Sequence, residues 1–400
     1  MKKILLATVI GAVSFAASAQ QALWGGSQIV SPEINDDNTV TFRLFAPNAD
    51  VVQVTGDFLP TQKMEVPQVG EVDVPGIADL VKNDNGVWEF TTTAPLNPEL
   101  YSYSFLVDGL RMMDPSNVYM IRDVATVTNV FLIDGKDSRA HYYKVNDVPH
   151  GTVSRVWYDS PTLEKKRRMT IYTPPGYEDS NESYPVFYLL HGAGGDEEAW
   201  IALGRTAQIL DNLIAEGKAE PMIVVMTNGN AVQSAAPGES AEGFVVPGMS
   251  ASRMSRGDFI LSFPDVVNYV DNHYRTKADK QNRAIAGLSM GGFHSLHISK
   301  QYPDLFDYIG LFSAAINPME ETDSPVFQDT EGKLKIQFEK HPKLYWIAIG
   351  DKDFLYDANV EYRKLLDDNG YPYIYYETPD GHIWKNWRIY LTEFAPQLFK

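Results

Sequence analysis

The N-terminal part of the chain carries short runs in which apolar and polar residues alternate. The clearest runs are residues 39–45, 51–54, 87–91 and 100–107. A period of two places successive side chains on opposite faces of an extended chain, so each run predicts a half-buried β-strand. Residues 83–86, just before the third run, are types that tolerate positive φ in tight turns. Short strands separated by such turns predict a small antiparallel sandwich of the immunoglobulin type.

From about residue 150 the pattern changes to wholly apolar runs that alternate with amphipathic ones. The apolar runs are residues 185–190, 222–226, 283–286 and 344–349. Such runs are typical of strands that are buried on both faces. Residues 209–214 and 263–274 instead carry apolar side chains three and four positions apart, which predicts helices. Strands and helices in alternation predict a mostly parallel sheet with helices on both faces.

The chain of 400 residues is long for a single domain, and 44% hydrophobic with 22% charged residues is an ordinary globular composition. We therefore predict an α/β protein with two domains. The β-sandwich is expected over residues 20–140 and the α/β domain over residues 141–400. A polar segment over residues 137–151, which contains Pro149 and Gly151, is the expected linker.

The first residues carry a separate signal. Lys2 and Lys3 precede an apolar run over residues 4–17, and small residues occupy positions 17–19. A charged start, a short apolar stretch and a small-residue cleavage site are the three parts of a signal peptide. We expect residues 1–19 to be removed near Ala19, which would place the mature protein in a periplasm or outside the cell.

Charge and cysteine content narrow the range of partners. With 34 basic and 52 acidic residues the formal net charge is −18, which repels phosphate backbones and anionic lipids. The sequence has no cysteine, so disulfides, thiolate metal sites and thiol catalysis are excluded. No run after the first residues approaches the roughly 18 consecutive apolar residues of a membrane helix. We expect neither nucleic acid nor a membrane as partner, and the sequence implies no metal or organic cofactor.

One glycine-rich run has the form of a catalytic turn. Residues 287–292 read Gly-Leu-Ser-Met-Gly-Gly, directly after an apolar strand and before a helical stretch. A serine on a tight strand-to-helix turn needs flanking glycines, because side chains there would collide with neighbouring backbone. This context predicts that Ser289 is a nucleophile in the elbow of an α/β-hydrolase domain.

A serine hydroxyl needs a base, and the base needs an acid. His382 follows the strand-like residues 373–376 near the C-terminus, where this fold presents its histidine. The acid must lie between the serine and the histidine, after a strand. Asp351 and Asp353 both follow the apolar run 344–349. We favour Asp353, which lies slightly further beyond the strand end, and expect Asp351 to cap the turn; the choice between them stays open.

The developing oxyanion needs preorganised donors, and residues 190–195, Leu-His-Gly-Ala-Gly-Gly, form a loop that supplies one of them in this fold. We assign the backbone N–H groups of Ala193 and Met290. Substrate contacts are predicted for His191, Trp200 and Trp384, although both tryptophans are equally suited to core packing.

These motifs carry a resemblance to known families. The C-terminal part resembles carbohydrate esterase family 1, the feruloyl and acetyl xylan esterases related to esterase D, through residues 191–195, 287–292, 350–353 and 381–388. The N-terminal part resembles the early-set sandwich of carbohydrate-binding module family 48, through the runs at 42–49 and 54–58. The resemblance implies a secreted serine esterase that removes feruloyl or acetyl groups from xylan-type plant polysaccharides through an acyl-serine.

Three other functions remain open from the sequence. A siderophore-ester hydrolase of the enterochelin type has a similar layout but predicts basic residues around the site, against the net charge of −18. An acyltransferase would share the first chemical step and use an alcohol in place of water. A non-catalytic glycan-binding protein would not need the serine, acid, histidine and glycine loop that are all present. The width of the acyl pocket depends on loops such as residues 230–253, whose path the sequence does not predict.

Overall fold

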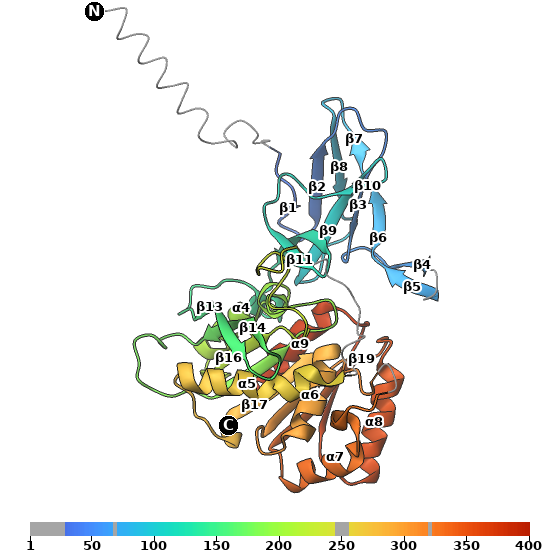
Figure 1. Ribbon diagram of the computed structural model, residues 1–400. Coiled ribbons are helices and arrows are strands. Elements are labelled where there is room, and N and C mark those ends of the chain that lie inside the picture. Colours follow the sequence, from blue (N-terminus) through green and yellow to red (C-terminus); the bar gives the residue numbers. More distant parts are fainter. Residues whose placement is uncertain (1–28, 67–69, 245–255, 319–321) are drawn as a thin grey trace, which may run out of the picture. The chain divides into compact units, whose positions relative to one another are not determined.

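The computed structural model describes residues 29–66, 70–244, 256–318 and 322–400, which divide into two compact units (Figure 1). The first unit contains the described residues up to Asn97, together with residues 101–120 and 128–133. The second contains residues 98–100, 121–127 and 134–400. The predicted boundary after residue 140 lies near the change at Asp134, but two short segments of the N-terminal part belong to the second unit. The predicted signal peptide lies outside the described residues.

The first unit is a β-sandwich with an additional hairpin. One sheet has the order β1 (Glu33–Ile34), β2 (Val40–Phe45), β8 (Val87–Thr91), β7 (Val81–Lys82). The other has the order β11 (Met120–Asp123), β12 (Thr126–Ile133), β9 (Glu99–Val107), β3 (Val52–Gly56), β6 (Gly76–Asp79), with β10 (Leu110–Met112) paired to β9. The hairpin pairs β4 (Gln62–Val66) with β5 (Gly70–Val74). Neighbouring strands such as β2 and β8 are antiparallel, as the alternating pattern predicts.

Aromatic side chains fill the space between the two sheets of the sandwich. Phe42 of β2 is fully buried, and its ring centroid lies 4.9 Å from that of Tyr103 and 5.6 Å from that of Phe131. Trp88 is 8% exposed, and its indole N–H donates to the carbonyl of Ala46 at 2.8 Å. The inward residues of the predicted alternating runs therefore form a core of their own.

The second unit is built on one eight-stranded mixed sheet. Its order is β13 (Thr152–Ser160), β14 (Lys165–Thr173), β16 (Ile223–Thr227), β15 (Val186–Leu190), β17 (Arg283–Leu288), β18 (Tyr308–Phe312), β19 (Leu344–Gly350), β20 (Ile374–Thr378). β13 and β14 are antiparallel to their neighbours, whereas the strands from β16 to β20 are parallel. The predicted fold class, a mostly parallel α/β-hydrolase sheet preceded by an all-β domain, is confirmed.

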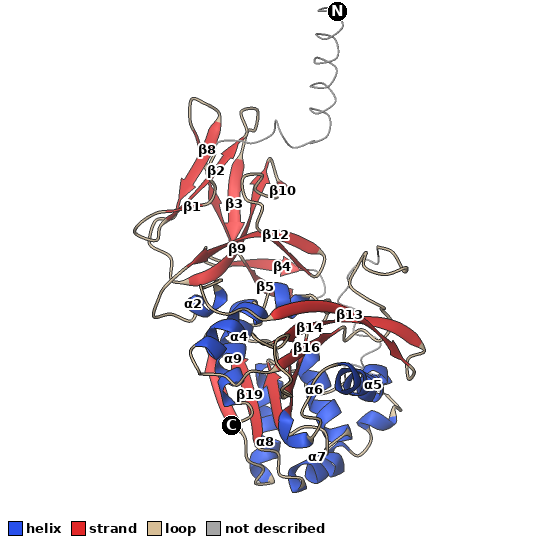
Figure 2. Cartoon of the chain, turned by 90° about the vertical axis from the view of Figure 1, so that its left-hand side faces the viewer, coloured by secondary structure: helices blue, strands red, loops and turns tan. Residues whose placement is uncertain are grey.

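Helices cover both faces of this sheet (Figure 2). On one face Tyr188 of β15 packs against Phe263 of α5 (Asp258–His273), with a ring distance of 5.3 Å. This face also packs α6 (Met290–Gln301), α7 (Thr330–Glu339) and α8 (Tyr356–Asp368). On the other face Trp346 of β19 packs against Phe394 of α9 (Trp384–Phe394) at 5.5 Å. Helix α9 in turn packs against α4 (Thr206–Ala215), and the short helices α2 (Ala140–Tyr143) and α3 (Ala199–Ala202) lie beside α4.

The register of the parallel strands brings their carboxyl ends together at one edge. Leu190 of β15 pairs with Gly287 of β17, and Gly350 of β19 pairs with Thr378 of β20. Loops that follow parallel strands therefore meet at this edge, which is where open α/β sheets bind ligands.

Candidate active site

Ser289 lies between the last residue of β17 and the first residue of α6. Its backbone has φ 54° and ψ −114°, a conformation that a non-glycine residue adopts only when its surroundings impose it. Two hydrogen bonds do so: the N–H of Ser289 donates to Phe312 at 2.9 Å, and the N–H of Ala315 donates to the Ser289 carbonyl at 3.1 Å. Its side chain is partly exposed. This is the geometry of a nucleophile elbow.

The glycines of this turn are required by close backbone approach. A Cβ on Gly287 would lie 2.5 Å from the carbonyl carbon of Gly291, and a Cβ on Gly291 would lie 2.3 Å from the carbonyl oxygen of Leu190. A Cβ on Gly292 would lie 2.6 Å from the Cβ of Ala314. Any larger residue at these positions would displace the turn and the serine with it.

His382 and Asp353 come from the loops after β20 and β19. The Nδ1 of His382 lies 2.8 Å from Oδ2 of Asp353, and the second carboxylate oxygen accepts the N–H of Leu355 at 2.9 Å. The aspartate side chain is fully buried and the histidine side chain is 18% exposed. Because a carboxylate only accepts hydrogen bonds, Nδ1 carries the proton and Nε2 is left as the base. Asp351 is exposed at the turn, away from this pair.

The loop after β15 lies directly against the serine. A Cβ on Gly192 would stand 3.3 Å from the Cβ of Ser289, so the neighbouring Ala193 is close to the reacting group. Met290 is the first residue of α6, and the first N–H groups of a helix have no carbonyl one turn earlier to bind. The positive end of the helix dipole adds to the attraction for an oxyanion. The two predicted donors therefore come from a loop and a helix start that meet at Ser289.

His191 has a different place from the one predicted. It is 1% exposed, its Nδ1–H donates to the carbonyl of Gly192 at 2.7 Å, and its Nε2 accepts the N–H of Gly229 at 2.7 Å. Burial lowers its pKa, which keeps the ring neutral. With both nitrogens bound to backbone, His191 has no polar atom for a substrate. It ties the loop after β15 to the loop after β16.

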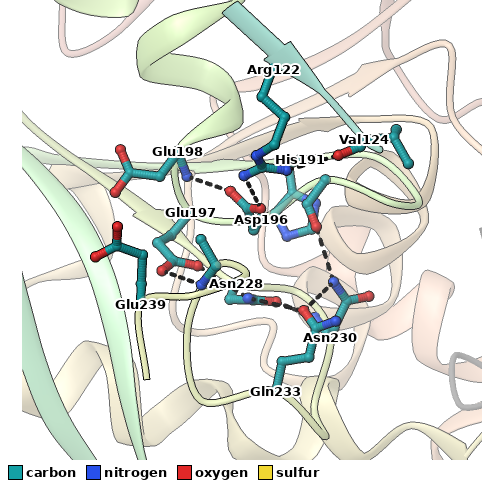
Figure 3. A network of polar contacts seen from close by, with 12 residues as sticks. Arg122, Val124, His191, Asp196, Glu197, Glu198, Asn228, Asn230, Gln233 and Glu239 are labelled. Atoms are coloured by element: carbon teal, nitrogen blue, oxygen red, sulfur yellow. Dashed lines mark hydrogen bonds and ion pairs between the residues drawn. The ribbon is translucent and has the colours of Figure 1, made fainter. Parts of the chain in front are cut away.

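A buried polar network holds the same two loops (Figure 3). Glu197 is fully buried and accepts from Arg168 at 2.8 Å, from Asn228 at 3.0 Å and from the N–H of Ala236 at 2.8 Å. Asn230 donates to the carbonyl of Gly195 at 3.0 Å. Because charged hydrogen bonds of this kind are stronger than neutral ones, they restrict the loop that carries Ala193. Residues 245–253 of the loop expected to shape the acyl pocket lie outside the described residues.

Of the two tryptophans predicted to contact substrate, one is a core residue and the other is half-buried. Trp200 is 1% exposed, donates from its indole N–H to the carbonyl of Leu190 at 2.9 Å, and has little surface left for a substrate. Trp384 is half-buried with its ring 5.3 Å from that of Trp200. Its side chain also forms a hydrogen bond with Asp123. Burial raises the pKa of Asp123, and this hydrogen bond offsets only part of that rise.

One exposed aromatic residue at the site was not predicted from the sequence. Phe354 follows Asp353, is 75% exposed, and its ring centroid lies 4.6 Å from that of His382. The signal was its position next to the predicted acid Asp353, in a loop at the carboxyl edge of the sheet. Phe354 therefore presents a solvent-exposed apolar ring beside the imidazole of His382.

His294 lies on α6, the helix that follows Ser289, and its burial leads us to predict how the stability of the protein changes at acidic pH. It is 2% exposed, and its Nδ1 has no hydrogen-bond partner within the part of the chain that the structure describes. Burial lowers its pKa from 6.5 to about 3. Between these values the unfolded chain binds a proton that the folded chain does not, so stability falls as the pH falls below about 6.5. One such histidine accounts for about 2 kcal/mol of unfolding free energy between pH 7 and pH 5.

We expect His294→Leu to remove this part of the pH dependence, measured by urea unfolding at pH 7 and pH 5. His273→Gln, at an exposed position on α5, should leave the dependence unchanged. An unaltered slope in the His294 variant would contradict the assignment.

No group of three or more His, Asp or Glu side chains in the described ranges is arranged to hold a metal ion. In the same ranges, none of the helices combines the length and the apolar character needed to cross a membrane.

Both parts of the chain are similar to known protein families. The family model named Esterase matches residues 160–398, and the model for carbohydrate-binding module 48, the isoamylase N-terminal domain, matches residues 29–118. An endo-1,4-beta-xylanase/feruloyl esterase of Xylanibacter ruminicola is 30% identical over 92% of this chain. The match covers 46% of that relative, so the chain spans about half of its length.

Two solved structures are similar as well. A CE1 ferulic acid esterase of Anaeromyces mucronatus in complex with ferulic acid is 27% identical, with a TM-score of 0.51 over 65% of this chain and 94% of that one. The enterobactin esterase of Shigella flexneri has a TM-score of 0.61 over 95% of this chain and 98% of that one, at 16% identity, which shows the shared fold alone. The esterase model covers more than half of the chain, including Ser289, Asp353 and His382, and this protein belongs to the esterase family.

Proposed function

We propose that this protein is a serine carboxylic ester hydrolase that works in two steps through an acyl-serine. The observation that carries the proposal is the set of a strained Ser289, a His382 held by Asp353 at 2.8 Å, and a glycine loop against the serine. The His382 Nε2 takes the proton of the Ser289 hydroxyl as its oxygen attacks the ester carbon. The N–H groups of Ala193 and Met290 bind the resulting oxyanion.

His382 then changes from base to acid within the first step. As the tetrahedral intermediate collapses, the ester C–O bond breaks and His382 gives its proton to the leaving alcohol oxygen. Water then attacks the acyl-serine while His382 takes a proton from that water, and the carboxylic acid leaves as Ser289 recovers its hydrogen. Apart from the ester and one water molecule, no group outside the chain is needed to balance these steps.

The proposed substrates are feruloyl or acetyl esters on xylan-type plant polysaccharides. Support comes from the Xylanibacter relative, named as a xylanase and feruloyl esterase, and from the ferulic acid esterase solved with ferulic acid. A sandwich that matches a carbohydrate-binding module supports a polysaccharide over a small free ester. Residues 1–19 support export as a further part of the proposal, and the N-terminal mass of the mature protein tests cleavage near Ala19.

The test is a product assay on arabinoxylan. We expect the protein to release ferulate, acetate or both, separated by liquid chromatography, while a Ser289→Ala variant releases neither. A protein that hydrolyses neither arabinoxylan esters nor simple aryl esters would contradict the proposal. Release that is equal in the alanine variant would do the same.

A siderophore-ester hydrolase is the second candidate, favoured by the extent of the match to the enterobactin esterase fold. That substrate is an anionic ferric complex, which the net charge of −18 repels. Faster hydrolysis of a ferric catecholate ester than of methyl ferulate would favour this candidate. An acyltransferase would give a new ester when an alcohol is added, and a non-catalytic protein would take no fluorophosphonate label on Ser289.

A further inference from the structure

Phe354 lies in the turn between β19 and α8, directly after the buried Asp353. The two side chains point to opposite environments: the aspartate side chain is fully buried, whereas the phenylalanine is 75% exposed. The Phe354 ring centroid lies 4.6 Å from that of His382, at an interplanar angle of 52°. An exposed apolar ring is therefore in contact with the imidazole that transfers the proton.

Among the residues that the structure describes, two aromatic rings contact His382, and only one of them is exposed to solvent. Trp387 lies 4.9 Å away at 86°, but it is 6% exposed and packs edge-on against Trp384 at 5.0 Å. Phe354 contacts the same imidazole and keeps most of its surface in solvent. Beside His382 in the chain, Ile383 is 42% exposed.

The chemistry of the triad indicates which part of an ester reaches this surface. His382 must lie next to the leaving alcohol oxygen, because it gives that oxygen its proton. The carbonyl oxygen lies instead at the donors that the loop after β15 and the start of α6 provide. The group bonded to the leaving oxygen therefore approaches His382 and the ring beside it.

We propose that Phe354 binds a sugar ring of the leaving alcohol and so determines preference for glycan esters over esters of small alcohols. This inference rests on the proposed esterase function and names the part of the substrate that the residue contacts. Sugar rings present C–H groups on their faces, which pack against aromatic rings while the hydroxyl groups remain in water. An exposed phenylalanine offers such a face without a polar group that would need a partner.

The experiment compares two esters that share one acyl group. Phe354→Ala is expected to raise KM for a feruloylated arabinoxylan oligosaccharide about tenfold, and to lower kcat/KM for methyl ferulate by a clearly smaller factor, at most about threefold. Phe354→Tyr, which keeps the ring, should restore the KM for the oligosaccharide. Ile336→Ala on α7, where the side chain is 47% exposed, is the matched control and should alter neither substrate.

Three results would overturn the inference. An equal loss on both esters would mean that Phe354 orients His382 or contacts the acyl group. An unchanged KM for the oligosaccharide would mean that no sugar binds on the ring. If the unsubstituted protein hydrolyses neither ester, the proposed esterase function is overturned as well. This outcome is distinguishable because the unsubstituted protein is assayed before any variant is compared with it.

Discussion

Ser289→Ala is expected to lower kcat on methyl ferulate by about a millionfold, the scale of removing the nucleophile from a serine hydrolase. The serine oxygen forms the covalent bond of the acyl intermediate, and no other described hydroxyl occupies the elbow at the end of β17. The residual rate would come from substrate binding and the oxyanion donors alone. The variant should keep its fold, because the backbone bonds of Ser289 do not involve its side chain.

The matched control is Ser299→Ala, at a buried serine of α6, the helix that follows Ser289. Its hydroxyl donates to the carbonyl of Leu296 at 3.1 Å. This control should retain kcat within a few-fold. Steady-state kinetics are combined with a fluorophosphonate probe, which we expect to label the unsubstituted protein and the control but not the Ser289 variant. Labelling of the Ser289→Ala protein would show that the nucleophile lies elsewhere.

Asp353→Asn is expected to lower kcat by about ten-thousandfold, as removal of the charge does in other triads. An asparagine amide in the same place can donate to Nδ1, which favours the tautomer whose Nε2 carries the proton and cannot act as a base. Oδ1 would still accept the N–H of Leu355, so the turn should persist. The Tm of the variant, measured by scanning calorimetry, separates loss of chemistry from loss of fold.

Asp351→Asn provides the matched comparison within the same loop. Its side chain is exposed, and its backbone N–H donates to the carbonyl of Thr378 at 2.9 Å, which the substitution preserves. We expect kcat within about threefold of the unsubstituted protein, as for exposed positions away from the reacting groups. A large loss at Asp351 together with a small loss at Asp353 would reverse the assignment of the acid.

Strand β14 could not be predicted, because its sequence begins with charged residues although the strand is buried in the sheet. β14 begins with Lys165, Lys166, Arg167 and Arg168, which does not resemble a strand inside a sheet. Arg167 is 1% exposed and donates to the carbonyls of Asn228 and Asn230 at 2.6 and 2.9 Å. Buried cations need partners that lie far away in the sequence. The periodicity of the sequence carries no information about those partners, so the antiparallel strand β14 was not predicted.

The site shows the same division. Local chemistry in the sequence was sufficient to nominate Ser289, because the flanking glycines and the strand before it are contiguous in the chain. It nominated His382 and its acid by their order after strands, since parallel strands bring their carboxyl ends to one edge. Contact roles were harder: His191 and Trp200 stand next to a catalytic loop in the sequence but are buried by its fold.

By itself the sequence determined the two-domain α/β architecture, the glycine-rich turn at Ser289 and the chain order of the predicted catalytic groups, because these depend on periodicity and on contiguous residues. Only the tertiary structure decided that Asp353 faces His382 while Asp351 faces solvent, that His191 binds two backbone groups, and that Phe354 lies exposed on the imidazole of His382. The direction of a side chain in a turn depends on what packs around it. Those neighbours come from strands and helices that only folding brings together.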